Sequence, residues 1–293
     1  MATQTEAGFS TIPNLWHTSG PHWDLLDDKF KGNILDILER SDGWDFKFWS
    51  HKEMCEELEA HAGKRIVDCF YRIDPRYGAA RADLFRYWVI YHYGGMWSDH
   101  KITQRLPGGW TEMFRELSPL PPLVLCNWGH PMWGKDLQVG DKLLKRGEIL
   151  NGWFASCPGH PLLRMVLDQV CANIEAYRDN FARVGVVRGS SKGTVGASGV
   201  VWLTGPMAWS QVLRRSLYAY PHLEVHGFQR LGLDFYKVQQ FAQLREKNNQ
   251  GLWGQAGSAS QVHQHYSKHT FPIILPEPDF SWRAPLVTEA PPV

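Results

Sequence analysis

The sequence predicts an α/β fold, a mixed β-sheet flanked by helices in a single domain. Apolar residues with a helical period run through 78–93 and stop at Gly94 and Gly95, where a helix favours a left-handed cap. A short strand, 96–98, follows directly and leads to the acidic Asp99. Because ligands of open α/β sheets bind at the carboxyl ends of strands, Asp99 marks a candidate site.

Similar patterns of apolar residues predict further helices and strands along the chain. Periodicity and composition predict helices at 30–40, 53–62, 162–179 and 207–218, and strands at 44–49, 123–126 and 200–203, the last followed by Thr-Gly-Pro at 204–206. The stretch 183–198 is rich in Gly, Ser and basic residues and is expected to form a loop over the site. The expected organisation is a flexible N-terminus (1–11), one domain (12–271) and a Pro-rich, extended tail (272–293).

Composition narrows the classes of function. A hydrophobic fraction of 43% with 14 Trp supports a large core, and a net charge of +1 gives no field that would attract nucleic acid. No run of 18 apolar residues and no basic, apolar leader occurs, so we expect a soluble, cytoplasmic chain without a membrane span. Five cysteines without a Cys-x-x-Cys pair are expected to be buried and reduced.

One string of residues carries a family resemblance. In order along the chain it comprises Ala79-Ala80, Asp83, Arg86-Tyr87, Gly94-Gly95 and Asp99. It resembles the core signature of the family-32 glycosyltransferases and their bacterial toxin relatives, in which an Ala-rich lead, Asp-x-x-Arg-Tyr, Gly-Gly and an Asp-x-Asp motif follow one another. Weaker patches extend the resemblance over residues 12–271. The chain departs from the family at Lys101, where the second motif aspartate is expected.

The resemblance implies a GT-A type, Rossmann-like fold and a retaining glycosyltransferase. Such an enzyme moves a sugar from a UDP- or GDP-sugar donor to a hydroxyl of a glycan, protein or small molecule. It also implies a Mn²⁺ or Mg²⁺ ion, which would stabilise the departing diphosphate.

Roles follow for individual residues. Asp83 is expected to accept hydrogen bonds from donor-sugar hydroxyls, Arg86 to contact sugar or phosphate, and Asp99 to hold the metal with His265. Lys101 completes the catalytic set of Asp83, Arg86, Asp99 and Lys101. The donor-binding residues implied by the resemblance are Leu15, Trp16, His17, Trp49, Ala80, Asp83, Arg86, Tyr87, Gly95, Ser98 and His265.

The departure at Lys101 leaves two possibilities open. Asp99 alone could bind a metal ion, or the Lys101 ammonium could neutralise the phosphates without one. On a strand the two side chains would point to the same face and reach the same diphosphate. The loss of the aspartate also allows a non-catalytic nucleotide-sugar-binding protein.

A second alternative is a zinc-dependent enzyme built on His263, His265 and His269, which have ligand-like spacing. No Gly-x-Ser-x-Gly, Gly-x-Gly-x-x-Gly or Walker loop is present, which argues against a hydrolase triad, a dinucleotide fold and a P-loop kinase.

Overall fold

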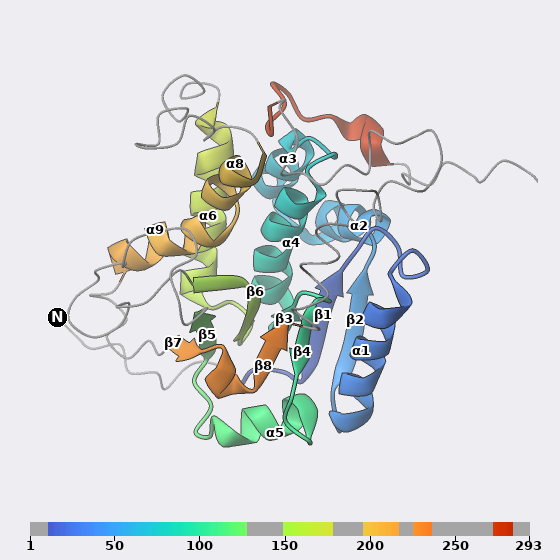
Figure 1. The fold of residues 1–293 in the computed structure, drawn as a ribbon. Coiled ribbons are helices and arrows are strands. Elements are labelled where there is room, and N and C mark those ends of the chain that lie inside the picture. Colours follow the sequence, from blue (N-terminus) through green and yellow to red (C-terminus); the bar gives the residue numbers. More distant parts are fainter. Residues whose placement is uncertain (1–10, 128–148, 178–195, 217–224, 236–271, 284–293) are drawn as a thin grey trace, which may run out of the picture.

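The computed structural model describes residues 11–127, 149–177, 196–216, 225–235 and 272–283. Within these ranges a six-stranded mixed sheet, in the order β2-β1-β3-β6-β5-β7, is flanked by helices, and a two-stranded sheet pairs β4 with β8 (Figure 1). The strands are β1 Leu15–Ser19, β2 Asp45–Trp49, β3 Gly95–Ser98, β4 Ile102–Gln104, β5 Leu123–Asn127, β6 Ile149–Ser156, β7 Val225–Gly227 and β8 Leu233–Phe235. The predicted α/β class, a mixed sheet with flanking helices in one domain, is confirmed.

The direction of the strands sets the position of the site. β1 pairs in parallel with β2 on one side and with β3 on the other, while β3 pairs antiparallel with β6. The chain therefore moves from β1 to β2 in one direction and returns to β3 in the other. The carboxyl ends of β1 and β3 lie side by side where the strand order reverses, which is the usual ligand position in such sheets.

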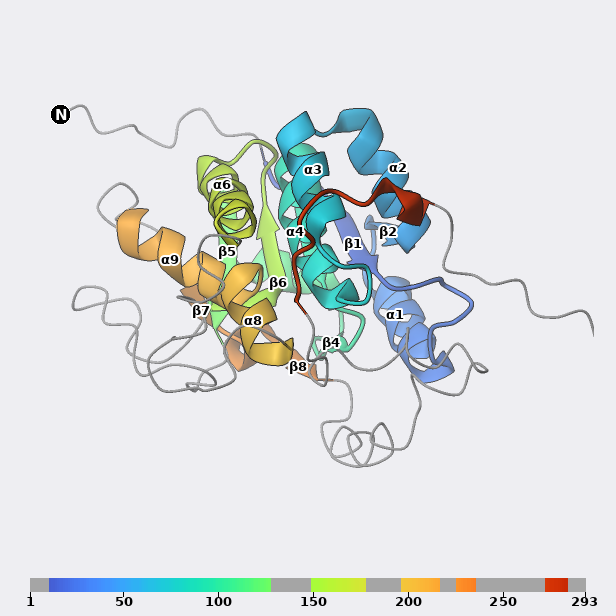
Figure 2. The ribbon, with the colours of Figure 1, turned by 90° about the horizontal axis from the view of Figure 1, so that it is seen from above.

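Helices cover both faces of the sheet (Figure 2). One face carries α2 His51–His61, α3 Lys64–Arg72, α4 Gly78–Tyr93, α6 Pro161–Glu175, α8 Gly196–Leu203 and α9 Pro206–Ser216. The other face carries α1 Asp28–Arg40 and α5 Gly109–Glu116. Two short 3₁₀ helices, η1 Gln229–Leu231 and η3 Phe280–Arg283, complete the described elements. No helix in these ranges is both long and apolar enough to cross a bilayer.

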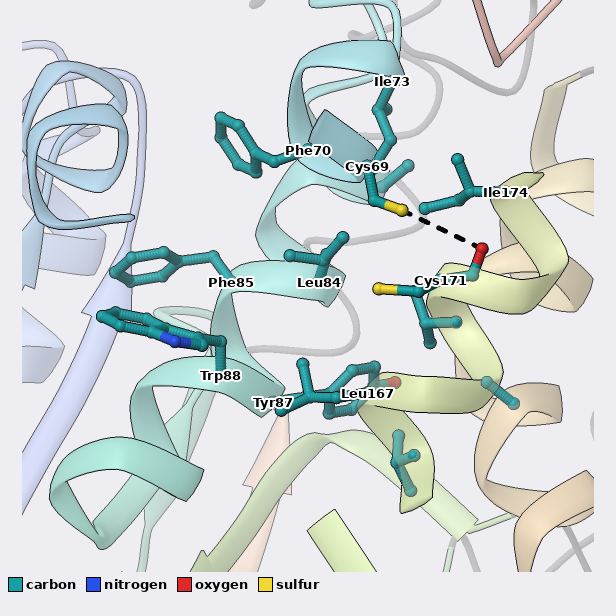
Figure 3. Packing of buried hydrophobic residues seen from close by; sticks show 14 of the residues in the cluster. Cys69, Phe70, Ile73, Leu84, Phe85, Tyr87, Trp88, Leu167, Cys171 and Ile174 are labelled. Carbon is teal, nitrogen blue, oxygen red and sulfur yellow. Dashed lines mark hydrogen bonds between the residues drawn. The ribbon is translucent and has the colours of Figure 1, made fainter. Parts of the chain in front are cut away.

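Strand alternation divides the core into two clusters. On β3, Met96 faces the α1 and α5 side whereas Trp97 faces the α4 side. On β6, Trp153 faces the α1 and α5 side and Phe154 faces the α4 side. Figure 3 shows the larger cluster, where α3, α4 and α6 pack together. All five cysteines are buried free thiols, as the composition predicted.

Helix α4 is buried on almost all sides. From Ala80 to Ile90, every residue except Ala82 is buried. The helix ends at Gly94, which has φ 71° and donates its N–H to the Ile90 carbonyl. Its polar residues are therefore held inside the fold and need partners there, since an unpaired buried polar group is costly.

The end of α4 leads into β3 through a second glycine. Gly95 has φ 91°, and a Cβ at this position would lie 2.3 Å from the Leu15 carbonyl oxygen of β1. Only glycine suits this backbone at so close an approach. The predicted helix, Gly-Gly stop and short strand are all confirmed.

The predicted strand at 200–203 is wrong, because these residues form the last turn of α8, and α9 begins three residues later at Pro206. Four apolar residues in a row, 200–203, fit a buried strand or a buried helix equally well by pattern. The Gly205 N–H bonds to the Val200 carbonyl and closes the helix. Packing of α8 against α4, α6 and α9 decides the conformation in favour of the helix.

The first part of the predicted tail packs on the domain. Ile273 and Ile274 are buried, and Ile274 forms an isolated bridge with Ile73 just after α3. The Asp74 N–H bonds to the Ile273 carbonyl at 2.8 Å, and the Leu275 N–H bonds to the Arg72 carbonyl at 2.7 Å. This segment lies beside α3 in both ribbon views (Figures 1 and 2).

Candidate active site

The candidate site lies where β3 ends beside β1. Asp99 directly follows β3, and its N–H bonds to the Gly152 carbonyl of β6 at 2.8 Å. His100 turns toward β1, with Nδ1 3.4 Å from the Ser19 carbonyl oxygen and its ring against Phe30. The turn after β3 is thus fixed to both neighbouring strands, and Asp99 is placed at the point where the strand order reverses.

Four predicted catalytic residues form one continuous chain of charges. Arg86 Nη2 lies 3.2 Å from Asp83 Oδ1 and 3.4 Å from Asp99 Oδ1. Lys101 Nζ lies 3.4 Å from Asp99 Oδ2. Two carboxylates and two cations therefore alternate, from α4 to the turn after β3.

Arg86 is the centre of this chain. Its Nη1 donates to the Asn151 carbonyl at 2.7 Å, and its guanidinium lies 5.1 Å from the centre of the Trp97 ring. The side chain is only 7% exposed, so these contacts fix the plane of the guanidinium. One cation is thereby held between Asp83 and Asp99.

Most hydrogen-bond acceptor positions of the Asp83 carboxylate are occupied by partners within the fold. Its Oδ1 accepts from Asn151 Nδ2 at 2.9 Å, and its Oδ2 accepts from the Thr204 hydroxyl at 2.8 Å. With Arg86, three of the roughly four acceptor positions of a carboxylate are used. Burial raises the pKa of Asp83 to about 6, against the lowering effects of Arg86 and Thr204.

Asp99 is the more accessible carboxylate. Burial acts to raise its pKa, but Arg86, Lys101 and the Trp97 Nε1–H bond at 3.0 Å outweigh it, so the pKa lies below the usual value. Its Oδ2 approaches β6 so closely that a Cβ at Gly152 would lie 2.9 Å away. Asp99 is thus a carboxylate whose outer oxygen faces Lys101.

Lys101 is the exposed member of the set, because its side chain is 40% exposed. The prediction that Asp99 and Lys101 share a face rested on a continuing strand, but β3 ends at Ser98 and both residues lie in the following turn. The turn nevertheless brings the two charged groups into contact.

His17 and Trp49 form a closed pair on β1 and β2. Trp49 Nε1 donates to His17 Nδ1 at 3.0 Å, so the proton of the neutral imidazole is on Nε2, which lies 3.2 Å from the Gly94 carbonyl oxygen. Burial lowers the pKa of His17 to about 4. Both ring nitrogens therefore have partners within the fold, and His17 joins β1, β2 and the end of α4.

The other predicted donor-binding residues lie mostly in the packed interior. Trp16 is fully buried, with its ring edge-on to Phe46 and Trp110. The Tyr87 hydroxyl donates to the Thr204 carbonyl at 2.9 Å and accepts from Asn151 Nδ2 at 3.2 Å. Buried or partly buried positions are also found for Leu15, Ala80, Gly95 and Ser98.

Sequence reasoning missed three residues that hold the charged chain together: Trp97, Asn151 and Thr204. Asn151 links Asp83, Arg86 and Tyr87, although it follows them by more than 60 residues in the chain. The segments around Asn151 and Thr204 do belong to the weaker patches of the resemblance, which was the available signal. Their contacts depend on how β6 and α8 pack on α4, which no local pattern encodes.

The implied metal ion fits the described donor set poorly. No group of three or more His, Cys, Asp or Glu side chains that could hold a metal occurs among the described residues. Each oxygen of Asp99 faces a cation, Arg86 on one side and Lys101 on the other. The predicted ligand His265, and the alternative zinc residues His263 and His269, lie outside the described residues. The predicted loop 183–198 also lies outside them up to residue 195, and its last three residues, 196–198, form the first turn of α8 and not a loop.

Comparison with known proteins adds a distant structural likeness. No known protein family and no curated relative matches the sequence. Among solved structures, the PaToxG glycosyltransferase superposes with a TM-score of 0.40 and 15% sequence identity, over 87% of this chain and 84% of that chain. A likeness this distant does not assign a family.

Proposed function

We propose that this protein is a glycosyltransferase that moves a sugar from a UDP- or GDP-sugar to a hydroxyl acceptor with retention of anomeric configuration. The acceptor would be a glycan, a protein or a small molecule. The observation that carries the proposal is the chain Asp83–Arg86–Asp99–Lys101 at the carboxyl ends of β1 and β3. Three of the four residues, Asp83, Arg86 and Asp99, belong to the signature string that resembles the family-32 glycosyltransferases, whereas Lys101 departs from it.

The arrangement suits the chemistry of a diphosphate leaving group. In the reaction, the bond from the sugar C1 to the diphosphate oxygen breaks, a bond from C1 to the acceptor oxygen forms, and the acceptor proton is released. Negative charge grows on the diphosphate, so the positive charges of Arg86 and Lys101 would stabilise the transition state more than the ground state. Asp83 and Arg86 would orient the donor sugar.

The direct test incubates the full chain with a panel of UDP- and GDP-sugars, with and without candidate acceptors, and measures released nucleoside diphosphate. We expect release from one donor, and a loss of at least about tenfold in Asp99→Asn, since the variant removes a charge that orders both cations.

The matched control is Asp68→Asn, which neutralises a partly exposed aspartate paired with Lys64 on α3. This variant should keep wild-type turnover. No release from any donor, or equal release by wild type and Asp99→Asn, would overturn the proposed function.

A further inference from the structure

The formal charge of the four site residues is already balanced without a metal ion. The described site holds two carboxylates, Asp83 and Asp99, and two cations, Arg86 and Lys101, which sum to zero. With an aspartate at position 101, as in the resembled signature, the sum would be −2, and one divalent ion would bring it to zero. The change from Asp to Lys adds the same charge as a divalent metal ion.

We propose that Lys101, held by Asp99, takes the place of a divalent metal ion, so that this protein binds the diphosphate of its donor without metal. The inference rests on the proposed function for the identity of the ligand, a nucleoside diphosphate group. Asp99 then acts as a positioning residue for an ammonium group and not as a metal ligand.

The geometry supports this assignment. Lys101 Nζ lies 3.4 Å from Asp99 Oδ2, the carboxylate oxygen that points away from Arg86. Because the Lys101 side chain is 40% exposed, its remaining N–H donors can reach a phosphate oxygen. A divalent ion on the same oxygen would lie close to this ammonium group and would be repelled by it.

Arg86 supplies the second cation from the interior. It is fixed by the Asn151 carbonyl, by the Trp97 ring and by both carboxylates. Because the Arg86 side chain is only 7% exposed, its guanidinium acts from behind Asp99 by fixing Oδ1 and adding positive charge, while the exposed Lys101 ammonium meets the diphosphate.

The test measures the binding of UDP and of GDP to the full chain by calorimetry, in EDTA and in excess Mn²⁺. We expect one of them to bind with affinities that agree within about twofold in the two conditions. Lys101→Met should weaken binding in EDTA by about tenfold or more, because a charge-assisted hydrogen bond is lost. Lys101→Arg, which keeps the charge, should retain most of the affinity. Binding that requires Mn²⁺, or full affinity of Lys101→Met in EDTA, would overturn the inference.

The control for loss of a surface charge is Lys64→Met, which breaks a surface Lys–Asp pair on α3. It should leave binding unchanged. Melting temperatures of all variants should stay close to that of the wild type, since Lys101 lies in a partly exposed turn.

A separate measurement of Mn²⁺ binding distinguishes a failure of this inference from a failure of the proposed function. Electron paramagnetic resonance of Mn²⁺ should show no stoichiometric binding by the wild type, with or without UDP or GDP, and a new site in Lys101→Asp. If that site appears but neither nucleotide binds, the exclusion of a metal ion by Lys101 stands, while diphosphate binding and with it the proposed function fail. Stoichiometric Mn²⁺ binding by the wild type, or no new site in Lys101→Asp, would contradict the inference.

Discussion

At the scale of single residues, buried charge is tolerated because each charged group has several fixed partners. Asp83 and Arg86 are 7% exposed at the side chain, and each contacts more than one group from another element. The family resemblance, and not the spacing of the residues, implied that Asp83, Arg86, Asp99 and Lys101 act together. The structure brings them into one chain of contacts. Their roles toward a donor stay predictions.

Asp83→Asn separates charge from shape. The amide oxygen introduced by this substitution can accept from Asn151 and Arg86, while the new amide N–H₂ donates to the Thr204 hydroxyl, which can turn its own proton to the Val200 carbonyl 3.3 Å away. We expect an unchanged fold and a loss of about 10- to 100-fold in kcat/KM for the donor, because charged acceptors bind sugar hydroxyls more strongly. Wild-type kcat/KM in a folded variant would contradict a role in orienting the sugar.

His17 predicts a pH dependence of stability. Its pKa of about 4 in the folded state is below the ordinary value of about 6.5, so the unfolded chain binds more protons between these values and stability falls as pH falls. His17→Asn keeps an acceptor for Trp49 Nε1 but does not titrate. From pH 7 to pH 5, the wild type should lose about 2 kcal/mol more of its free energy of unfolding than the variant. Urea unfolding at both pH values measures this, and parallel losses would contradict it.

At the scale of elements, the sequence predicted helices and strands best where a single local residue sets the backbone conformation. Gly94 and Gly95 determine where α4 ends and β3 begins. The end of the helix was predicted correctly, and the strand begins at Gly95, one residue before its predicted start. The α8 segment was predicted wrongly because its conformation comes from packing on α4, α6 and α9. The short ladder of β4 with β8 joins residues more than 120 positions apart and has no local signature.

Gly95→Ala tests the junction between α4 and β3. The new Cβ would lie 2.3 Å from the Leu15 carbonyl oxygen, in a backbone conformation with φ 91°. We expect a loss of more than about 3 kcal/mol in the free energy of unfolding, or failure to fold.

Gly159→Ala is the matched control for this substitution. Its φ is 71°, but no atom lies within 4 Å of the new Cβ, so only the backbone cost of about 1 kcal/mol should appear. Denaturant unfolding of both variants measures the difference. Equal effects would mean that the contact with β1 is unimportant.

At the scale of the whole molecule, residues far apart in sequence close the fold around α4. The segment 272–275 bonds to Arg72 at the end of α3 and to Asp74 just after it, and Arg65 of α3 bridges to Asp168 and Glu175 of α6. Helix α4 itself packs against α3, α6 and α8, which keeps Asp83 and Arg86 in place beside the turn after β3.

Ile273→Ala tests whether the C-terminal segment is part of the domain. Ile273 is fully buried, so the substitution should lower the free energy of unfolding by about 2–4 kcal/mol. Leu35→Ala on α1, where Leu35 is 55% exposed, should change it by less than about 0.5 kcal/mol. Urea unfolding gives both values. A negligible effect at Ile273 would show that this segment adds little to the core.

The most direct measurement of the central claim is ³¹P and ¹H NMR of the full chain incubated with UDP- and GDP-sugars and acceptors. The proposal predicts conversion of one donor to its nucleoside diphosphate, with a new anomeric proton signal of the same configuration as the donor. Donors that stay intact, or that yield a nucleoside monophosphate and a sugar phosphate, would contradict sugar transfer at the Asp83–Arg86–Asp99–Lys101 site.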